Sequence, residues 1–286
     1  MNVVQNLRCI LRNQQKLLQN AYATASIRGV SSYTEMTQCD GVREITLNEA
    51  KTRNSLSLAM MDSILENLTK DINNEELRCI ILSANGPVWS AGHNLKELAN
   101  SDECEQTEVF NKLTEIIMNI YQAPVPVIAK VNGLAAAAGC QLVASCDIVV
   151  CSDKSSFSTP GANFGIFCST PGIAVSRVMP RLKSSYMVLT GLPIKAQDAN
   201  AAGLVSVVVP ENQLDEEVSK IAASIISKSR AVIALGKSFY YKQLGMNIRD
   251  AYTAGAEKMT ENLNIADGVE GLKSFLEKRK PNWTHK

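Results

Sequence analysis

The chain has 286 residues, of which 45% are hydrophobic and 20% are charged, with 29 Lys and Arg against 28 Asp and Glu. This is the composition of an ordinary globular protein, long enough to bury one substantial core. The balanced charge argues against nucleic acid as the main partner. The most apolar stretch, PVPVIAKVNGLAAAAGC, is interrupted by Lys130 and Asn132, so we expect no membrane span.

The N-terminal segment is basic. Residues 1–34 contain Arg8, Arg12, Lys16 and Arg28 and no acidic residue. At helical spacing the first three basic residues share one face and leave an apolar stripe on another, a pattern typical of a mitochondrial transit peptide. We therefore expect a protein of the mitochondrial matrix; a disordered basic tail is the alternative interpretation.

From residue 38 to 210, strand-like and helix-like segments alternate, which predicts an α/β fold. Strands are expected over 41–48, 77–84, 125–131, 146–152 and 205–209, and helices over 57–72 and 109–120, with a short Ala-rich helix after 132. After Pro210 only helical periodicity continues. Residues 211–286 are therefore predicted to form a helical C-terminal subdomain.

The cysteines and histidines offer little for a metal site. None of the eight cysteines has C-x-x-C spacing, and His93 and His285 are the two histidines of the chain. A zinc site is therefore not expected, and no metal is predicted. Most cysteines adjoin apolar runs, which favours buried free thiols in a reducing compartment.

Two loops rich in small residues are the candidate site. They are VWSAGHNLKEL (88–98) and NGLAAAAGCQLVASCD (132–147), and each leads into a helix. Small side chains allow a ligand to approach backbone amides, and the first turn of a helix has free N–H groups. Two such donors could converge on one carbonyl oxygen as an oxyanion hole. Tight packing alone is the other interpretation.

The order of motifs resembles the crotonase (enoyl-CoA hydratase/isomerase) superfamily. The similar segments run from ITLNEAKTRNSLS (45–57) through the two loops above and TGLPIKAQDANAAGLVSVVVP to FLEKRKPNW (275–283). The resemblance covers about residues 38–286. It implies a crotonase-type ββα spiral core over 38–210, a helical subdomain for trimerisation over 211–286, and a homotrimer or hexamer. It also implies a coenzyme A thioester as substrate or ligand, with no separate cofactor, in mitochondrial fatty-acid or acyl-CoA metabolism.

The resemblance assigns roles to particular positions. The donors to the thioester oxygen fall on the backbone N–H groups of His93 and Ala138. Six further positions match contacts to coenzyme A: Lys51 and Lys96 near its phosphates, Ala91 and Leu95 near adenine and pantetheine, and Phe275 and Lys278 reaching the ligand of a neighbouring subunit. The His93 side chain is either a weak base or a bystander. Cys168 falls in the segment that flanks the acyl group.

Two positions depart from the family pattern. The hydratases of the family use two glutamates to add water, and these positions hold Gln141 and Gly161 here. Glutamine does not exchange a proton near neutral pH, and glycine has no side chain, so efficient hydration is not expected. Replacing both residues by glutamate is expected to restore it.

Three functions stay open on this evidence. The first is an enzyme that uses the hole for decarboxylation or thioester hydrolysis. The second is a non-catalytic acyl-CoA binder or regulatory subunit. The third is a slow enoyl-CoA hydratase.

Overall fold

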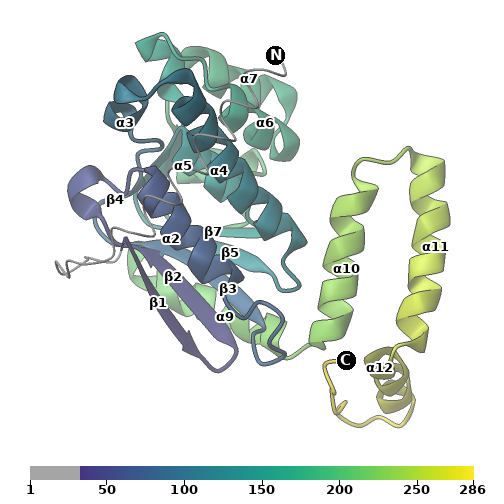
Figure 1. Ribbon diagram of the computed structural model, residues 1–286. Helices are drawn as coiled ribbons and strands as arrows, with labels where there is room; N and C mark the ends of the chain where they lie inside the picture. Colours follow the sequence, from purple (N-terminus) through teal and green to yellow (C-terminus); the bar gives the residue numbers. More distant parts are fainter. Residues whose placement is uncertain (1–32) are drawn as a thin grey trace.

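A computed structural model describes residues 33–286 (Figure 1). The basic segment that the sequence predicts to be a transit peptide therefore lies, except for its last two residues, outside the described residues. The strands are β1 (Thr34–Cys39), β2 (Val42–Leu47), β3 (Cys79–Ala84), β4 (Val88–Ser90), β5 (Val127–Val131), β6 (Leu134–Ala136), β7 (Ile148–Ser152), β8 (Ser156–Ser158), β9 (Ile194–Lys195) and β10 (Val207–Val209).

Helices connect and cover these strands. The α-helices are α2 (Leu58–Thr69), α3 (Leu95–Asn100), α4 (Glu103–Gln122), α5 (Ala138–Ala144), α6 (Ser169–Val178), α7 (Arg181–Thr190), α8 (Ala196–Ala201), α9 (Leu214–Ile226), α10 (Arg230–Gln243), α11 (Ile248–Asn264) and α12 (Ala266–Leu276). Three short 3₁₀ helices complete the described chain: η1 (Ala50–Thr52), η2 (Pro160–Phe164) and η3 (Glu211–Gln213).

The strands form two sheets. The larger has the order β1-β2-β3-β5-β7-β10, and the smaller has the order β4-β6-β8-β9. Among the strand pairs that the described residues form, β1–β2 and β8–β9 are antiparallel and the others are parallel. Three times in succession, one strand of the large sheet is followed by one strand of the small sheet and then by helical structure: β3–β4–α3, β5–β6–α5 and β7–β8–η2. This repeat confirms the predicted α/β fold with a ββα spiral core.

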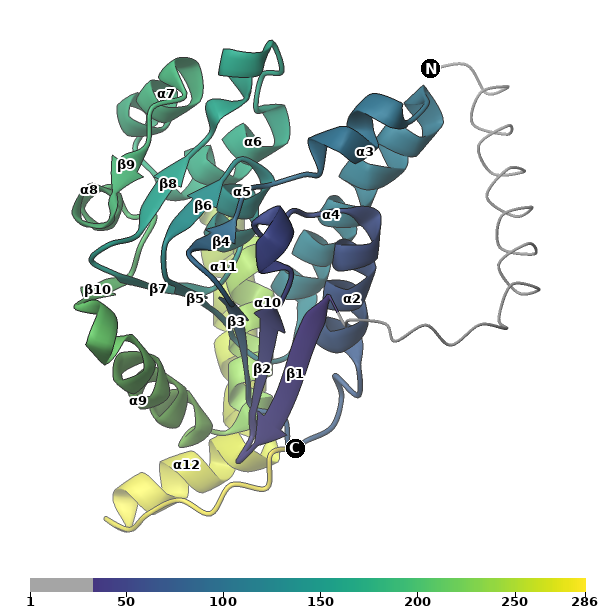
Figure 2. The ribbon, with the colours of Figure 1, turned by 90° about the vertical axis from the view of Figure 1, so that its left-hand side faces the viewer.

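Helices cover both faces of the large sheet because its central strands are apolar on both faces. In β3, Ile80 and Leu82 belong to the core cluster that includes α2 and α4. Cys79 and Ile81 point to the opposite face, where they join Leu214, Val218 and Ala222 of α9. Figure 2 shows α9 on one side of this sheet and α2 and α4 on the other. The continuous apolar run of strand length predicted this burial.

The predicted helix over 57–72 begins where its sequence indicates. The hydroxyl of Ser57 accepts a hydrogen bond from the Met60 N–H at 3.2 Å and caps the first turn of α2. Met61, Ile64 and Leu68 are fully or almost fully buried on one face. The helix ends at Thr69, three residues before the predicted end.

The fold begins earlier than residue 38. Thr34 opens β1 and is 3% exposed, and its hydroxyl lies 2.6 Å from the Ser63 hydroxyl and accepts from Asn67 at 2.8 Å. Most other side chains of β1 are exposed because it is an edge strand, paired on one side only, with β2. Its polar sequence TEMTQC therefore lacks the apolar pattern that identified the other strands.

The C-terminal helices α10, α11 and α12 extend from the core and are called the arm below (Figure 1). A buried ionic network holds α10 against the core. The Lys237 ammonium, 9% exposed, lies 2.6 Å from the Asp147 carboxylate, which also accepts from the Tyr241 hydroxyl at 2.7 Å. Burial lowers the pKa of Lys237 and raises that of Tyr241.

Several large apolar side chains of the arm are not covered by any other part of residues 33–286. Tyr252 is 76% exposed and Phe275 is 79% exposed, and Ile248, Met259, Leu272 and Leu276 are also more than half exposed. Apolar surface of this extent is typical of a protein–protein contact.

Candidate functional site

The two loops that the sequence singled out lie against each other at backbone distance. Gly92, with φ of +87°, packs so closely on the start of α5 that a Cβ there would be 2.9 Å from the Ala136 carbonyl oxygen and 3.0 Å from the Ala138 nitrogen. The next residue, His93, forms an isolated parallel bridge with Leu56. The segment carrying the His93 N–H is thus fixed beside the segment carrying the Ala138 N–H, and only glycine fits at the contact.

The start of α5 has an unusual backbone conformation. Ala137 has φ of 48° and ψ of −120°, a combination that side-chain-bearing residues rarely adopt. Its N–H donates to the Ser158 carbonyl at 2.9 Å, and its carbonyl accepts from the Gln141 N–H at 3.0 Å. The sharp turn directs the chain from β6 straight into a helix whose first-turn N–H groups have no acceptor within the helix.

Close packing fixes α5 on its other side too. A Cβ on Gly139 would lie 2.7 Å from both the Cβ and the carbonyl oxygen of Ser90 in β4. The Ser90 hydroxyl donates to the Asn54 carbonyl at 2.8 Å and accepts from the Gly92 N–H at 3.2 Å. One serine therefore links α5, the Gly92 loop and the chain before α2.

Two buried side-chain nitrogen or oxygen atoms in residues 33–286 lack a hydrogen-bond partner, and both belong to predicted site residues: His93 Nε2 and Gln141 Oε1. Gln141 is 5% exposed. Unpaired buried polar atoms are rare in folded proteins, and functional sites are one of the places where they persist. These two atoms mark the same region that the backbone contacts define.

The imidazole of His93 is held in one orientation. Its Nδ1 lies 3.3 Å from the Leu56 carbonyl oxygen, to which it donates, and its ring packs edge-to-face on Phe110 with centroids 5.2 Å apart. Burial lowers the pKa of His93, and its bond to Leu56 offsets only part of that effect. The ring is therefore neutral at pH 7, with an unprotonated Nε2. The residue is half-buried and its Nε2 is fully buried, so the side chain does not point freely to solvent; whether it acts as a weak base or as a bystander stays a prediction.

Gly161, the second position where the hydratases of the resembled family have a glutamate, has backbone atoms where a side chain would lie, so that the backbone seals this position. A Cβ on Gly161 would lie 2.1 Å from the Ile166 carbonyl oxygen and 2.7 Å from the Cys168 sulfur. The Gly161 N–H donates to that sulfur at 3.2 Å, and its carbonyl accepts from the Ile166 N–H at 3.0 Å. Burial raises the pKa of the Cys168 thiol. A side chain at 161 would therefore require this turn to open, and the recovery of hydration with glutamate at both 141 and 161 stays a prediction.

Four of the predicted coenzyme A contacts come from neighbouring segments. The Ala91 N–H donates to the Arg53 carbonyl at 3.0 Å, which joins its loop to the turn after η1. Lys51 lies in η1, and Leu95 and Lys96 begin α3 directly after the Gly92 loop. Lys51, Leu95 and Lys96 are exposed, and Ala91 is half-buried.

The remaining two predicted contacts lie elsewhere. Phe275 is the last residue but one of α12, Lys278 follows the helix, and both are exposed. Both views place α12 at the opposite end of the molecule from α3 and α5 (Figures 1 and 2). A single chain does not bring these residues to the other site residues.

Sequence reasoning missed the residue that organises the turn before α2. Asn54 is fully buried, and its side chain accepts from the Glu49 N–H and donates to the carbonyls of Asn85 and Val88, each at 2.9 Å. Its φ of 50° is one that asparagine tolerates better than most residues. The Asn-Ser dipeptide of KTRNS was a weak signal for such a turn.

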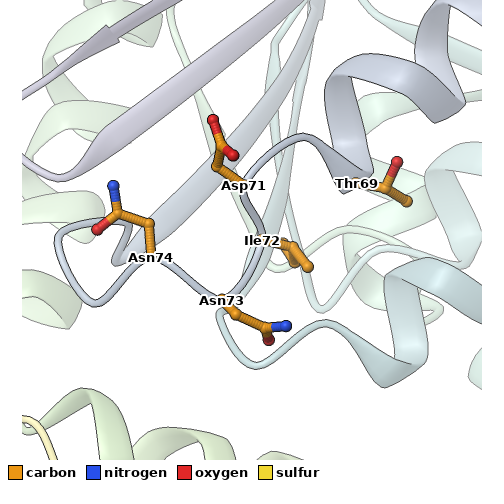
Figure 3. Close-up of a pocket in the computed structure, with 5 residues that line it drawn as sticks. All are labelled: Thr69, Asp71, Ile72, Asn73 and Asn74. Atoms are coloured by element: carbon orange, nitrogen blue, oxygen red, sulfur yellow. The ribbon is translucent and has the colours of Figure 1, made fainter.

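A hollow at the turn after α2 has no link to these residues. Thr69, Asp71, Ile72, Asn73 and Asn74 line it (Figure 3).

Within residues 33–286 no three His, Cys, Asp or Glu side chains gather as a metal site would require. In the same range, none of the helices combines the length and apolar character needed to cross a bilayer.

Within residues 33–286, five cysteines are buried free thiols: Cys79, Cys140, Cys146, Cys151 and Cys168. Burial raises the pKa of Cys79, Cys140 and Cys151 to about 12. Cys39, also free, is exposed near the turn between β1 and β2.

Comparison with known proteins places almost all of the described chain in one family. The family model for enoyl-CoA hydratase/isomerase matches residues 37–286. The chain is 52% identical to mitochondrial enoyl-CoA hydratase domain-containing protein 3 of Homo sapiens and 51% identical to that of Rattus norvegicus, in each case covering 88% of this chain and 84% of the relative.

Solved structures agree with the sequence relatives. The crystal structure of human enoyl coenzyme A hydratase domain-containing protein 3 matches with a TM-score of 0.85, over 88% of this chain and all of that chain. An enoyl-CoA hydratase from Mycobacterium smegmatis also matches with a TM-score of 0.85, at 38% identity, over 88% of this chain and 98% of that chain. The chain belongs to the enoyl-CoA hydratase/isomerase family.

Proposed function

We propose that the protein binds acyl-CoA thioesters and holds the thioester oxygen with the backbone N–H groups of His93 and Ala138. The observation that carries the proposal is the contact of Gly92 with Ala138, which fixes the two donor segments side by side. Backbone donors need no particular side chain, so alanine at 138 leaves the donor intact. The two unpartnered polar atoms, His93 Nε2 and Gln141 Oε1, support a ligand site at the same place.

The proposed coenzyme A path runs over the adjacent surface. Lys51 and Lys96 would meet the phosphates as charge-assisted donors, while Ala91 and Leu95 would contact adenine and pantetheine. Phe275 and Lys278 would serve the ligand of a neighbouring subunit in a homotrimer or hexamer. Their distance from the other site residues and the exposed apolar surface of the arm support that arrangement.

The proposed chemistry is one that needs no pair of carboxylates. Gln141 replaces one hydratase glutamate, the backbone seals Gly161 at the other, and residues 156–172 contain no acid. Decarboxylation sends the electron pair of the broken C–C bond onto the thioester oxygen, so an oxyanion hole can serve it without a base. Thioester hydrolysis also places negative charge on that oxygen.

A non-catalytic acyl-CoA binder is the second candidate. The sealed Gly161 favours it, because the structure leaves no space there for a proton-transferring side chain. Slow hydration is the third. For all three we propose a place in mitochondrial fatty-acid or acyl-CoA metabolism, in the matrix, because the related proteins named above are mitochondrial.

The test is product analysis. The purified full chain is incubated with enoyl-, malonyl-type and saturated acyl-CoAs, and the products are followed by mass spectrometry. Loss of CO₂ or release of free coenzyme A supports the first candidate. No product, with thermal stabilisation by an acyl-CoA, supports the binder. Rapid addition of water would contradict the argument from the two missing glutamates, and no binding of any thioester would refute the proposal as a whole.

A further inference from the structure

The chain folds back after α12 and is hydrogen-bonded to the first turn of that helix. Figure 1 shows this return, which brings the C-terminus next to the start of α10. The Asp267 carboxylate, on a residue that is 1% exposed, accepts from the Thr284 N–H and hydroxyl at 2.7 and 2.8 Å. It also accepts from the His285 N–H at 2.8 Å. Residues 283–285 are called the strap below.

The His285 imidazole connects the strap to the core. Its Nε2 lies 2.8 Å from Arg78 Nη1, and the same guanidinium donates to the Ile226 carbonyl at 3.0 Å. A guanidinium only donates, so Nε2 carries a lone pair and the ring in this arrangement is neutral. Nδ1 lies 3.4 Å from the backbone nitrogen of Arg230, the first residue of α10. The ring therefore joins the strap to the residue before β3 and to the junction between α9 and α10.

The charges around His285 disfavour a second proton on the ring. Arg78 and Arg230 are the cations that act on it, and Asp267 and Glu75 are the anions. The Asp267 carboxylate is already engaged by N–H and O–H groups of the strap. Burial and Arg78 lower the pKa of His285, and the two carboxylates offset only part of that effect.

We propose that the strap is a pH-sensitive latch, in which neutral His285 holds α12 to the core and protonation of the ring releases it. A proton on Nε2 removes the acceptor for Arg78 and places a third cation beside two guanidinium groups. Because the closed strap favours the neutral ring, closure is fully favoured above the usual histidine pKa of about 6.5 and weakens as the pH falls below it. This latch does not depend on the binding of an acyl-CoA.

The position of part of the exposed apolar surface of the arm depends on the strap. Leu272, Phe275 and Leu276 of α12 are 53%, 79% and 72% exposed. A single residue, Ile265, links α12 to α11. The closed strap holds α12 and its apolar side chains in one place relative to the core, and an open strap removes that restraint.

Trp283 is a built-in reporter of the strap. Its indole N–H donates to the Ser227 carbonyl at 3.0 Å, and its ring lies beside Gly271 of α12, where an added Cβ would be 3.3 Å away. The other tryptophan of the chain, Trp89, is fully buried. Release of the strap exposes the Trp283 indole. Acrylamide quenching of the full chain should therefore increase as the pH falls from about 8 to about 5, with a midpoint below about 6.5.

Three variants identify the group that titrates and the source of the signal. In His285→Gln the amide oxygen can accept from Arg78 but does not titrate, so the increase in quenching should vanish. Lys286→Gln, the same substitution at the next and exposed residue, should keep the wild-type increase. Trp283→Phe should abolish the signal, because Trp89 stays buried.

Three results would overturn the inference. The first is quenching of the wild-type protein that does not change with pH, a result that needs no variant. The second is an increase of wild-type size in His285→Gln. The third is a loss of the helical circular dichroism signal over the same pH range, because the quenching would then report unfolding of the whole chain rather than release of the strap.

Discussion

Gly161→Ala tests whether the backbone leaves no room for a side chain at the second of the two positions that hold glutamate in the hydratases. The added Cβ would lie 2.1 Å from the Ile166 carbonyl oxygen and 2.7 Å from the Cys168 sulfur. The oxygen belongs to the backbone, so relief of the overlap requires the turn between Gly161 and Ile166 to open. Opening would also stretch the two hydrogen bonds that close the turn, Gly161 N–H to Cys168 and Ile166 N–H to Gly161.

The magnitude follows from these contacts. Overpacking costs about 1–3 kcal/mol, and one lost hydrogen bond adds ~1 kcal/mol, which gives about 2–4 kcal/mol of destabilisation. For a chain of this size each kcal/mol lowers Tm by roughly 2–4 °C, so thermal unfolding should occur about 4–16 °C lower.

A matched control lies in the next helix. A Cβ on Gly172 in α6 would be 3.8 Å from the nearest atoms, both of Val188, which is ordinary contact. Gly172→Ala should therefore leave Tm unchanged or raise it, because alanine favours the helix by about 0.5–1 kcal/mol. Calorimetric unfolding of both variants makes the comparison. If Gly161→Ala unfolds at the same temperature as Gly172→Ala, the turn is not sealed and our account of position 161 is refuted.

Three further predictions concern the site and the arm. Gly92→Ala should weaken acyl-CoA binding at least tenfold in a titration, because the added Cβ would press on the Ala138 nitrogen and because the φ of +87° at residue 92 disfavours a side chain. Wild-type affinity in this variant would contradict the fixed contact between the two loops. Lys237→Met should lower the free energy of unfolding, measured in denaturant, by about 3–5 kcal/mol, because Asp147 would stay buried without its cation. The control Lys220→Met, at an exposed position, should change it by less than ~0.5 kcal/mol, and similar losses in the two variants would disprove the role of the buried pair. An NMR titration should show both histidines with a pKa below 6.5, His93 because of burial and His285 because of burial and the nearby Arg78. Protonation then favours the unfolded chain, so the free energy of unfolding should fall as the pH drops below about 6.5. A pKa at or above 6.5 for either ring would contradict these causes.

Elements with a strong apolar pattern could be predicted from the sequence. The continuous run in LRCIILSA identified β3, and Met61, Ile64 and Leu68 identified the buried face of α2. β1 has polar and mostly exposed residues because it is an edge strand, so no periodicity marked it. The three-residue strands β4, β6 and β8 are too short to show any period.

The site was predictable as positions but not as contacts. Small residues at 92 and 138 indicated close approach, yet their actual contact joins chain segments more than forty residues apart. The same limit applies to Gly161, whose missing side chain was visible in the sequence while the carbonyl that blocks it was not. Lys237 and Asp147 pair over 90 residues, and neither residue has a local pattern that reveals its partner.

The central claim is that two backbone N–H groups bind the oxygen of an acyl-CoA thioester. The most direct test compares the affinity of the full chain for butyryl-CoA and for S-butyl-CoA, the thioether that lacks the carbonyl oxygen. Two hydrogen bonds of ~0.5–1.5 kcal/mol each predict that the thioester binds about 5- to 150-fold more tightly. Equal affinity for the two compounds would show that the carbonyl is not recognised and would contradict the proposed oxyanion hole.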